Sequence, residues 1–286
     1  MATTELTGAA GYRPSAAKRA QLWLASHFVM ISALLVLAYM FLPILYTFIF
    51  SFNDHGKTNI VWQGFTTDHW KDPCGVPGAC ESLVTSLQIS ALSTLVATVL
   101  GTMMALAMVR YQFRGKAASN LLVFVPMATP EIVLGASLLT IFVQGFTRFG
   151  VNLGFWTITA AHIMFCLSFV VVAVRARIQS LDPRIEEAAQ DLYAGPQATF
   201  WRVTFPLILP GVLGAAMLAF SLSFDDFIIT NFVSGNESTF PKFVYVSAKR
   251  GIPAEANVIG ISMFVIAIAL VVGGTLLASV RAKKAA

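Results

Sequence analysis

Six long apolar segments, separated by short polar stretches, are the feature that most constrains this chain. They cover residues 28–52, 83–109, 121–144, 151–174, 204–224 and 258–280. A helix needs about 20 mostly apolar residues to cross the hydrocarbon core of a bilayer, so each segment can span a membrane. With 57% hydrophobic and 12% charged residues, the composition excludes a disordered chain, a coiled coil and a soluble enzyme with a charged surface. The sequence therefore predicts an all-α membrane protein with six transmembrane helices.

The basic residues fall mainly on one side of the predicted spans. Thirteen of the 19 lysine and arginine residues lie at the chain ends or in the loops after the second and fourth spans. Because cytoplasmic loops are enriched in these residues, both termini are expected in the cytoplasm. The predicted parts are a cytoplasmic segment (1–27), a transmembrane domain (28–280) with a cytoplasmic loop (175–203), and a cytoplasmic tail (281–286). The net charge of +5 then reflects orientation in the cell membrane, and no nucleic-acid partner is expected.

The three cysteines occupy two different environments. Cys74 and Cys80 lie in the first outward loop, where oxidising conditions permit a disulfide, although their spacing does not decide whether they pair. Cys166 lies inside the fourth span and is expected to pack as a small apolar residue.

Small residues recur every four positions in two of the predicted spans. The rows comprise Ser93, Ala97, Gly101 and Ala105 in the second span, and Gly211, Ala215, Ala219 and Ser223 in the fifth. Residues four apart share a helix face, and small side chains let helix backbones approach closely in lipid. The rows therefore predict packing faces within a bundle. In the third span, Pro126 and Pro130 free backbone carbonyls, which only protein or a water-filled cavity can satisfy at membrane depth.

Three carboxylates lie in or next to the predicted spans. Glu131 lies about ten residues into the third span, near the middle of the bilayer, whereas Asp225 and Asp226 end the fifth span at its outer edge. An ionisable group at membrane depth is costly and indicates either a transport path or a paired structural group. Phe224 and Phe227 flank the aspartates and could present ring faces to an ammonium group. We predict that these five residues line a substrate path; a structural Glu131 and a solvated aspartate pair are the alternatives.

His162 lies inside the fourth span without a visible acidic or metal-binding partner. It is therefore expected to be a hydrogen-bonded packing residue and not a proton relay. The chain has no cluster of metal ligands, nucleophile motif or dinucleotide-binding motif, so the sequence predicts neither a catalytic site nor a metal site.

The cytoplasmic loop carries a recognisable motif. Glu187, Ala188 and Ala189 are followed by Gly195 and by the segment 200–210, which ends in Leu-Pro. This arrangement resembles the EAA loop of ABC importer permeases, except that Tyr193 stands at the position of the motif's glycine. The resemblance implies that residues 185–195 form a coupling helix held in a cleft of the ATPase, with Glu187 as its polar anchor.

Further segments narrow this resemblance. Residues 129–133, 153–156, 222–227 and 251–257 are similar to the inner-membrane permeases of spermidine/putrescine importers, and the similarity extends over about residues 20–280. It implies the type I ABC importer permease fold, with an ATPase dimer, a second permease subunit, an extracytoplasmic substrate-binding protein and the lipid bilayer as partners. ATP and Mg would be bound by the ATPase, and this chain would hold no cofactor and catalyse no reaction. The predicted function is polyamine import; the alternatives are a type I permease for another small solute and an ATP-independent channel.

Overall fold

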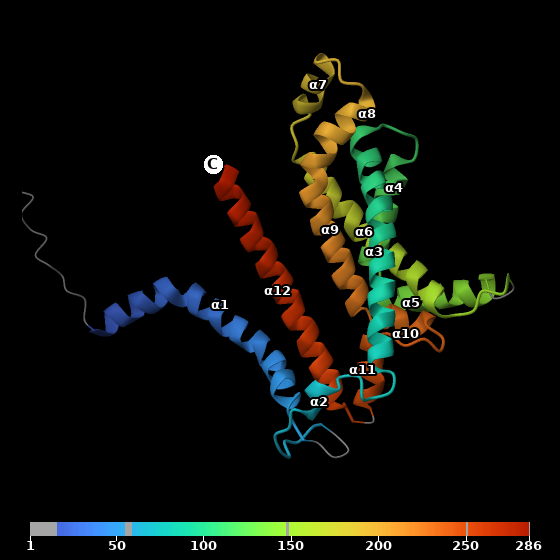
Figure 1. The fold of residues 1–286 in the computed structure, drawn as a ribbon. Helices are drawn as coiled ribbons and strands as arrows, with labels where there is room; N and C mark the ends of the chain where they lie inside the picture. The colour runs from blue at the N-terminus through green and yellow to red at the C-terminus, as the bar shows by residue number, and fades with distance from the viewer. Residues whose placement is uncertain (1–15, 55–58, 147–148, 250, 286) are drawn as a thin grey trace, which may run out of the picture.

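The computed structural model describes residues 16–54, 59–146, 149–249 and 251–285, with side chains described between residues 27 and 276 of these ranges. Over these ranges the regular structure is helical, apart from one isolated antiparallel bridge between Asn53 and Phe65. In chain order the helices are α1 (Ala16–Phe50), α2 (Asp68–Lys71), α3 (Ala79–Arg110), α4 (Lys116–Ala128), α5 (Glu131–Ile141), η1 (Phe142–Phe146), α6 (Phe155–Gln179), α7 (Arg184–Asp191), α8 (Pro196–Thr199), η3 (Phe200–Thr204), α9 (Phe205–Asp225), α10 (Ile228–Val233), α11 (Phe240–Ala248) and α12 (Ala254–Ala285). Figure 1 shows their arrangement.

Five of the six predicted spans are confirmed as long apolar helices. The described residues contain candidate membrane spans at His27–Phe50, Ala79–Arg110, Phe155–Gln179, Pro196–Asp225 and Ala254–Leu276. The fourth of these joins α8, η3 and α9 into one continuous helical stretch that begins before the boundary predicted from hydropathy. An all-α membrane protein is therefore the correct fold class.

The third predicted span is broken into two helices. α4 and the α5–η1 segment meet at an angle of 109°, so a single helix over residues 121–144 was the wrong prediction. The break lies at Thr129 and Pro130: proline lacks a backbone N–H, and the residue before it is driven out of the helical region. Thr129 accordingly adopts an extended backbone with ψ 131°. Glu131 consequently begins α5 and does not lie in the middle of a continuous helix.

α3, α6 and α9 pack into the central bundle through the predicted small-residue faces. Ala97 and Ala105 are fully buried, and Ser223 at the end of the other row is 3% exposed. A Cβ atom placed on Gly101 would lie 2.6 Å from Cγ1 of Val170 on α6, well inside van der Waals contact. The two rows are therefore confirmed as packing faces within the chain.

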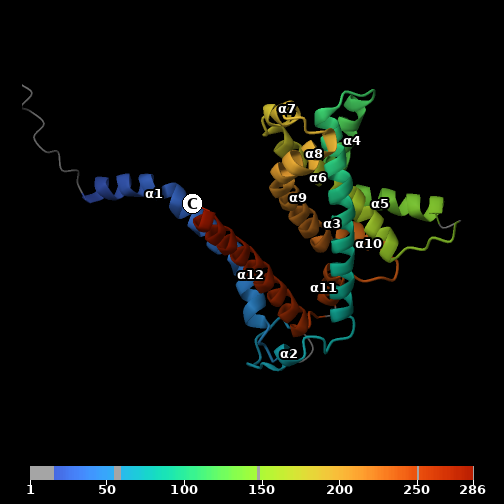
Figure 2. The ribbon, with the colours of Figure 1, turned by 45° about the horizontal axis from the view of Figure 1, so that its top comes forward.

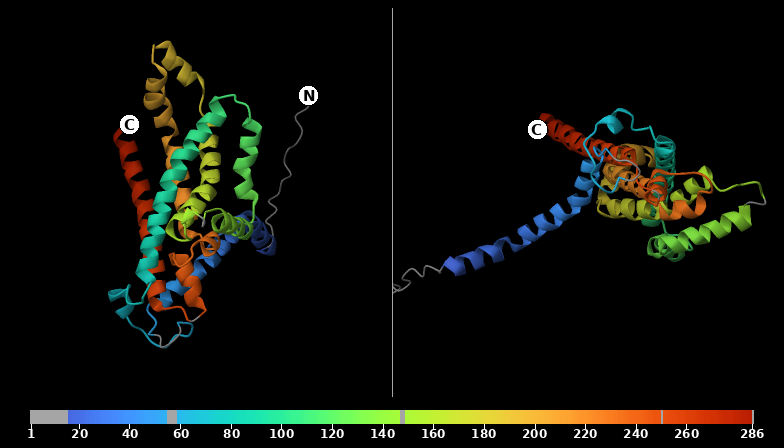
Figure 3. Two further views of the ribbon diagram at one scale, coloured as in Figure 1. Left: turned by 90° about the vertical axis from the view of Figure 1, so that its right-hand side faces the viewer. Right: turned by 90° about the horizontal axis from the view of Figure 1, so that it is seen from below.

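α1 and α12 stand apart from the central bundle. In its most apolar stretch, none of α1 and only 17% of α12 is buried within the chain. The two helices contact each other, for example through the rings of Phe41 and Phe264, whose centroids are 6.5 Å apart. Figures 1 and 2 show the pair joined to the bundle near α2 and α11, and Figure 3 shows α1 extending away from it. Most of the apolar surface of this pair is thus left to lipid or to other proteins.

The loop between α1 and α3 is held by covalent and polar contacts. Cys74 and Cys80 form a disulfide with a Cα–Cα distance of 5.3 Å, which answers the question that their spacing left open. Nδ1 of His69 in α2 lies 2.9 Å from Oε1 of Glu255, in the first turn of α12. Cys166 is buried and free, as predicted.

Candidate functional site

A large cavity lies along α9 and α12, at the end of the bundle where α9 stops. Its volume is about 1030 Å³, and most of its lining is apolar, with contributions from α6, α9 and α12. Its lining includes all five residues that the sequence predicts for a substrate path, namely Glu131, Phe224, Asp225, Asp226 and Phe227. The fold thus brings together residues that are almost 100 positions apart in the chain.

Asp225 and Glu131 present open carboxylates at this cavity. Asp225 is the last residue of α9, and Glu131 is the first residue of α5. Both residues are exposed, and within the described part of the chain neither side chain has a hydrogen-bond or salt-bridge partner. The alternative of an arginine-paired Glu131 therefore finds no support in the described residues. Two unpaired carboxylates beside an apolar wall favour a cationic ligand.

Asp226 is placed differently from its neighbour. The backbone turns out of the helix at this residue (φ −67°, ψ 120°), and its side chain is only 3% exposed. Its carboxylate accepts hydrogen bonds from the backbone N–H of Ile229 (3.3 Å) and from the N–H and Oγ1 of Thr230 (2.8 and 2.9 Å). Asp226 thereby caps α10, so the alternative of a solvated aspartate pair is wrong for this residue.

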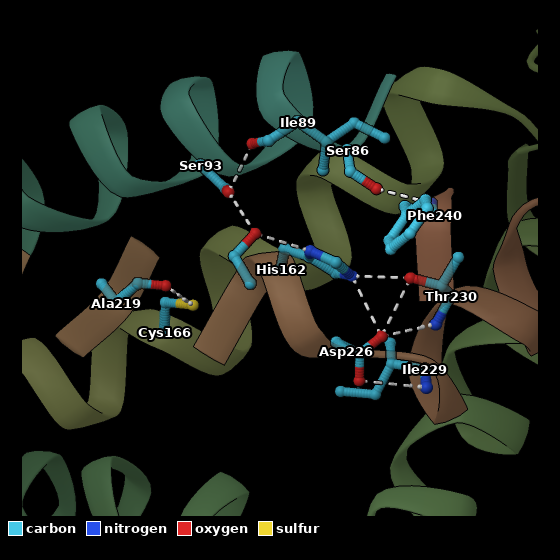
Figure 4. Close-up of polar contacts among 11 residues, drawn as sticks. Ser86, Ile89, Ser93, His162, Cys166, Ala219, Asp226, Ile229, Thr230 and Phe240 are labelled. Atoms are coloured by element: carbon cyan, nitrogen blue, oxygen red, sulfur yellow. Dashed lines mark hydrogen bonds and ion pairs between the residues drawn. The ribbon is translucent and has the colours of Figure 1, made fainter. Parts of the chain in front are cut away.

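His162 completes a buried polar cluster with this aspartate (Figure 4). Its Nε2 lies 3.2 Å from Oδ2 of Asp226 and 3.0 Å from Oγ1 of Thr230, and its Nδ1 lies 2.8 Å from Oγ of Ser223. Ser223 Oγ is in turn 2.9 Å from Oγ of Ser93 on α3. We call Ser93, His162, Ser223, Asp226 and Thr230 the His162 cluster; it connects α3, α6, α9 and α10.

The prediction that His162 packs through hydrogen bonds is confirmed, but the histidine has an acidic partner that the sequence does not reveal. The partner is Asp226, 64 positions further along the chain, and nothing local to His162 indicates it. The clue in the sequence lies at Asp226 and not at His162. Asp226 continues the small-residue face that ends at Ser223, and this face is expected to pack inside the bundle.

At the opposite end of the bundle, α7 exposes the residues of the EAA-like motif. Glu187 and Ala188 are exposed, Ala189 is partly exposed, and Gly195 precedes α8 with an extended backbone (φ −67°, ψ 162°). Tyr193 adopts φ 61°, in the left-handed region that glycine favours, and is 99% exposed. The backbone at this position therefore has the conformation that glycine favours, although the residue is a tyrosine.

Glu186, which the sequence analysis did not single out, ties this loop to the bundle. Its Oε1 accepts hydrogen bonds from the guanidinium of Arg110 at the end of α3 (2.6 Å) and from Oγ1 of Thr204 before α9 (2.8 Å). Its neighbour Glu187 is exposed, because consecutive residues on a helix point in different directions. α7 thus has one glutamate that holds the protein together and one that is available to a partner.

The described residues contain no group of three or more histidine, cysteine, aspartate or glutamate side chains that could hold a metal ion. The described site is therefore an apolar cavity with two open carboxylates at one end of the bundle and an exposed helical loop at the other.

This combination of bundle, cavity and loop defines a permease subunit of an ABC importer. The chain belongs to the family of binding-protein-dependent transport system inner membrane components, whose sequence profile matches residues 97–282. Its members are multi-span transport subunits of the inner membrane, and the predicted membership of the importer permeases is confirmed.

The chain is also similar to curated polyamine permeases. It is 34% identical over 249 residues to the spermidine/putrescine transport system permease protein PotC of Escherichia coli K12, covering 87% of this chain and 92% of PotC. The putrescine transport system permease protein PotI of the same organism is 36% identical over 228 residues (78% and 81% coverage). A PotC homolog of Mycoplasma pneumoniae is 31% identical over 268 residues (91% and 92%).

Solved structures show the same fold. A chain of a bacterial ABC transporter for the import of alginate aligns with a TM-score of 0.64 at 18% identity, covering 88% of this chain and 95% of that chain. The MetNI methionine ABC transporter in inward-facing conformations aligns with a TM-score of 0.56 at 16% identity, covering 70% and 95%. The type I importer permease fold is thereby confirmed.

Proposed function

We propose that this permease subunit carries polyamines such as spermidine and putrescine across the cell membrane. The observation that supports it most is the pair of open carboxylates, Asp225 and Glu131, at the wall of one cavity. Polyamines are flexible chains with several ammonium groups, so spaced carboxylates and apolar walls complement both their charges and their methylene segments. The named functions of PotC and PotI support the same substrate class.

The five cavity residues have different roles in substrate recognition. Asp225 and Glu131 receive ammonium groups, and Phe224 and Phe227 present aromatic faces to the same cations. Phe227 packs against Tyr245 in a tilted arrangement, with ring centroids 4.3 Å apart and an interplanar angle of 34°, and this contact holds its ring at the cavity. Asp226 contributes by holding the end of α9 in place, because its own lone pairs are already used by α10 and His162.

Transport is driven from the cytoplasmic loop. In this proposal the segment 185–195 docks in a cleft of an ATPase dimer, which binds ATP and Mg, and Glu187 with Ala188, Ala189 and Gly195 forms the contact. The bonds of Glu186 to Arg110 and Thr204 carry the movement of α7 to α3 and α9. Because α9 ends at the cavity, a displacement of the loop would change the cavity's access between inward-open and outward-open states.

The remaining partners follow from the same proposal. A second permease subunit faces the cavity and covers apolar surface on α1 and α12, and an extracytoplasmic binding protein delivers the substrate. Both termini and the loop 175–203 lie in the cytoplasm, with 1–27 and 281–286 as terminal segments outside the transmembrane domain 28–280. The alternatives are a type I permease for another small solute and an ATP-independent channel.

Uptake of radiolabelled putrescine and spermidine tests the substrate. Cells that lack this gene receive wild-type protein, Asp225→Asn, Glu131→Gln or Asp72→Asn, and membrane abundance is matched. Asp72 is an exposed carboxylate next to the disulfide loop and serves as the control for loss of one charge. We expect uptake with wild type and the control, and strongly reduced uptake with the other two variants.

Different outcomes separate the alternatives. If wild type restores uptake of neither amine, another solute is the substrate. Uptake that persists when the partner ATPase carries an inactivating substitution would indicate a channel. If all three variants transport normally, the two carboxylates do not line the path.

A further inference from the structure

The His162 cluster lies at the point where the chain changes direction between α9 and α10. α9 ends at Asp225, Asp226 is extended, and α10 begins two residues later at Ile228. Asp226 ties this corner to α6, since it caps α10 and contacts His162. Ser223, one turn before the corner, contacts the other ring nitrogen of the same histidine. One buried imidazole therefore fixes the end of α9 and the start of α10 together.

α10 in turn supports the helix that carries the second open carboxylate. A Cβ atom on Gly135 of α5 would lie 2.6 Å from Cδ2 of Phe232 and 3.4 Å from Cα of Ile229, so α5 and α10 are in close contact. Gly135 is four residues, about one helical turn, after Glu131. The position of Glu131 therefore depends on α10, just as the position of Asp225 depends on the corner that directly follows it.

The cluster is anchored in the most buried part of the molecule. His162 is 1% exposed, and Ser93, Ser223 and Thr230 are 3% exposed or less. A buried polar network that is fully hydrogen-bonded has few alternative arrangements, because each displaced group would be left without a partner. The cluster can therefore act as a rigid reference between α6 and the two carboxylates.

We propose that His162 is a positioning residue that fixes the separation between the carboxylates of Asp225 and Glu131, and that this separation selects polyamines by length. This inference rests on the proposed function, since it takes the cavity ligand to be a chain with ammonium groups at both ends. A diamine whose ammonium groups match the separation contacts both carboxylates, whereas a shorter or longer one gives up one contact or must bend. Selectivity is then a difference in binding free energy between lengths, and it requires that the two carboxylates stay in place.

A thiol-labelling measurement tests the positioning without any substrate. In Asp225→Cys the introduced thiol has no competitor among the described residues, because Cys74 and Cys80 are paired and Cys166 is buried. The protein, in its assembled transporter, is labelled with a cationic methanethiosulfonate reagent in three further backgrounds: His162→Leu, His162→Gln and Thr159→Val. Thr159 is buried on the same helix and bonds only to the carbonyl of Phe155, so it is the matched control.

We expect His162→Leu to change the labelling rate several-fold, because the corner loses its contact with α6. His162→Gln keeps a donor and an acceptor and should restore a rate close to that of the parent, and Thr159→Val should leave it unchanged. If His162→Leu is absent from membranes, Ser223→Ala replaces it, since that change removes the contact to Nδ1 without adding bulk. An unchanged rate in a variant of normal abundance overturns the proposal.

A competition profile tests the selection by length. Uptake of labelled putrescine is competed with a series of α,ω-diamines from propanediamine to octanediamine, with Asp225 present. Wild type and Thr159→Val should be competed best by diamines of one particular length. His162→Leu should show a flattened or shifted length profile, and His162→Gln should restore the wild-type optimum. The same optimum in His162→Leu would refute the selection.

The two experiments distinguish this proposal from the one on which it rests. If wild type takes up no polyamine, the proposed substrate fails, and the labelling rates still decide whether His162 positions the corner. If wild type transports polyamines while labelling and profile are insensitive to His162, the substrate stands and the positioning role is rejected.

Discussion

Replacing Gly101 with alanine should separate the two most closely packed spans of the bundle. The new Cβ would lie 2.6 Å from Cγ1 and 2.9 Å from Cβ of Val170 on α6, whereas carbon atoms in contact are about 3.5–4.0 Å apart. Val170 cannot turn away, because its own Cβ is involved and a β-branched side chain in a helix has essentially one rotamer. The helices must therefore move apart, and overpacking of this kind costs about 1–3 kcal/mol.

The alanine also has a favourable effect that a control must remove. Alanine is more stable than glycine in a helix interior by about 0.8–1.0 kcal/mol, which offsets part of the clash in Gly101→Ala. Gly214→Ala on α9 has the same propensity gain, but no atom lies within 4 Å of its new Cβ. The difference between the two variants therefore isolates the clash, which we expect to be about 1–3 kcal/mol.

The assay is the thermal midpoint of the transporter in mild detergent, measured by size-exclusion chromatography after heating. Gly101→Ala should lose its monodisperse peak at a lower temperature than Gly214→Ala. Adding Val170→Ala should recover part of the loss, because it removes the clashing methyl groups, and the two changes should therefore be non-additive. Equal midpoints for Gly101→Ala and Gly214→Ala, or strict additivity with Val170→Ala, would refute the close approach of α3 and α6.

Three further predictions concern the two ends of the bundle. Glu187→Lys reverses the charge on the exposed face of α7, so it should lose co-purification of the ATPase; normal recovery of the ATPase in a pull-down would contradict the docking role. Arg110→Gln removes the charged partner of Glu186, so uptake should fall several-fold while the pull-down stays normal, and unimpaired uptake would show that this contact carries no movement. Cys74→Ser removes the disulfide that closes a short loop, and it should lower the free energy of unfolding by about 2 kcal/mol. A reducing agent should lower the thermal midpoint of wild type but not of this variant, and equal effects on both would contradict the disulfide assignment.

The break at Pro130 shows how far local reasoning reaches. The two prolines in the third apolar segment indicate weak points in a helix, but they do not give the angle between the pieces. That angle is 109°, and α10 supports it by packing on α5 through the contact of Gly135 with Phe232. A hydropathy window averages over the break, because it measures composition and ignores direction. For the same reason the sequence does not show that Glu131 begins a new helix.

The aspartate pair shows a second limit of local reasoning: identical neighbouring residues can have different environments. Asp225 and Asp226 are the same residue type at adjacent positions, and hydropathy and helix propensity treat them alike. In the structure the first opens onto the cavity and the second is buried against His162 and Thr230. The cause is that α9 ends between the two residues, which turns their side chains in different directions. Only the side chain of Asp226 then faces α6.

By itself, the sequence determined the membrane environment, the number and length of the apolar segments, the small-residue packing faces and the family. These properties depend on sums over local residues: the free energy of moving a segment into lipid, and the repeat of a helix face. Only the tertiary structure decided which carboxylates stay open, which acid partners His162, and that Glu186 binds the bundle beside an exposed Glu187. Those outcomes depend on which helices cross and at what angle. A hydrogen bond acts only over about 3 Å, and the residues that form these bonds are far apart in the sequence, so only the packing of the helices brings them within reach.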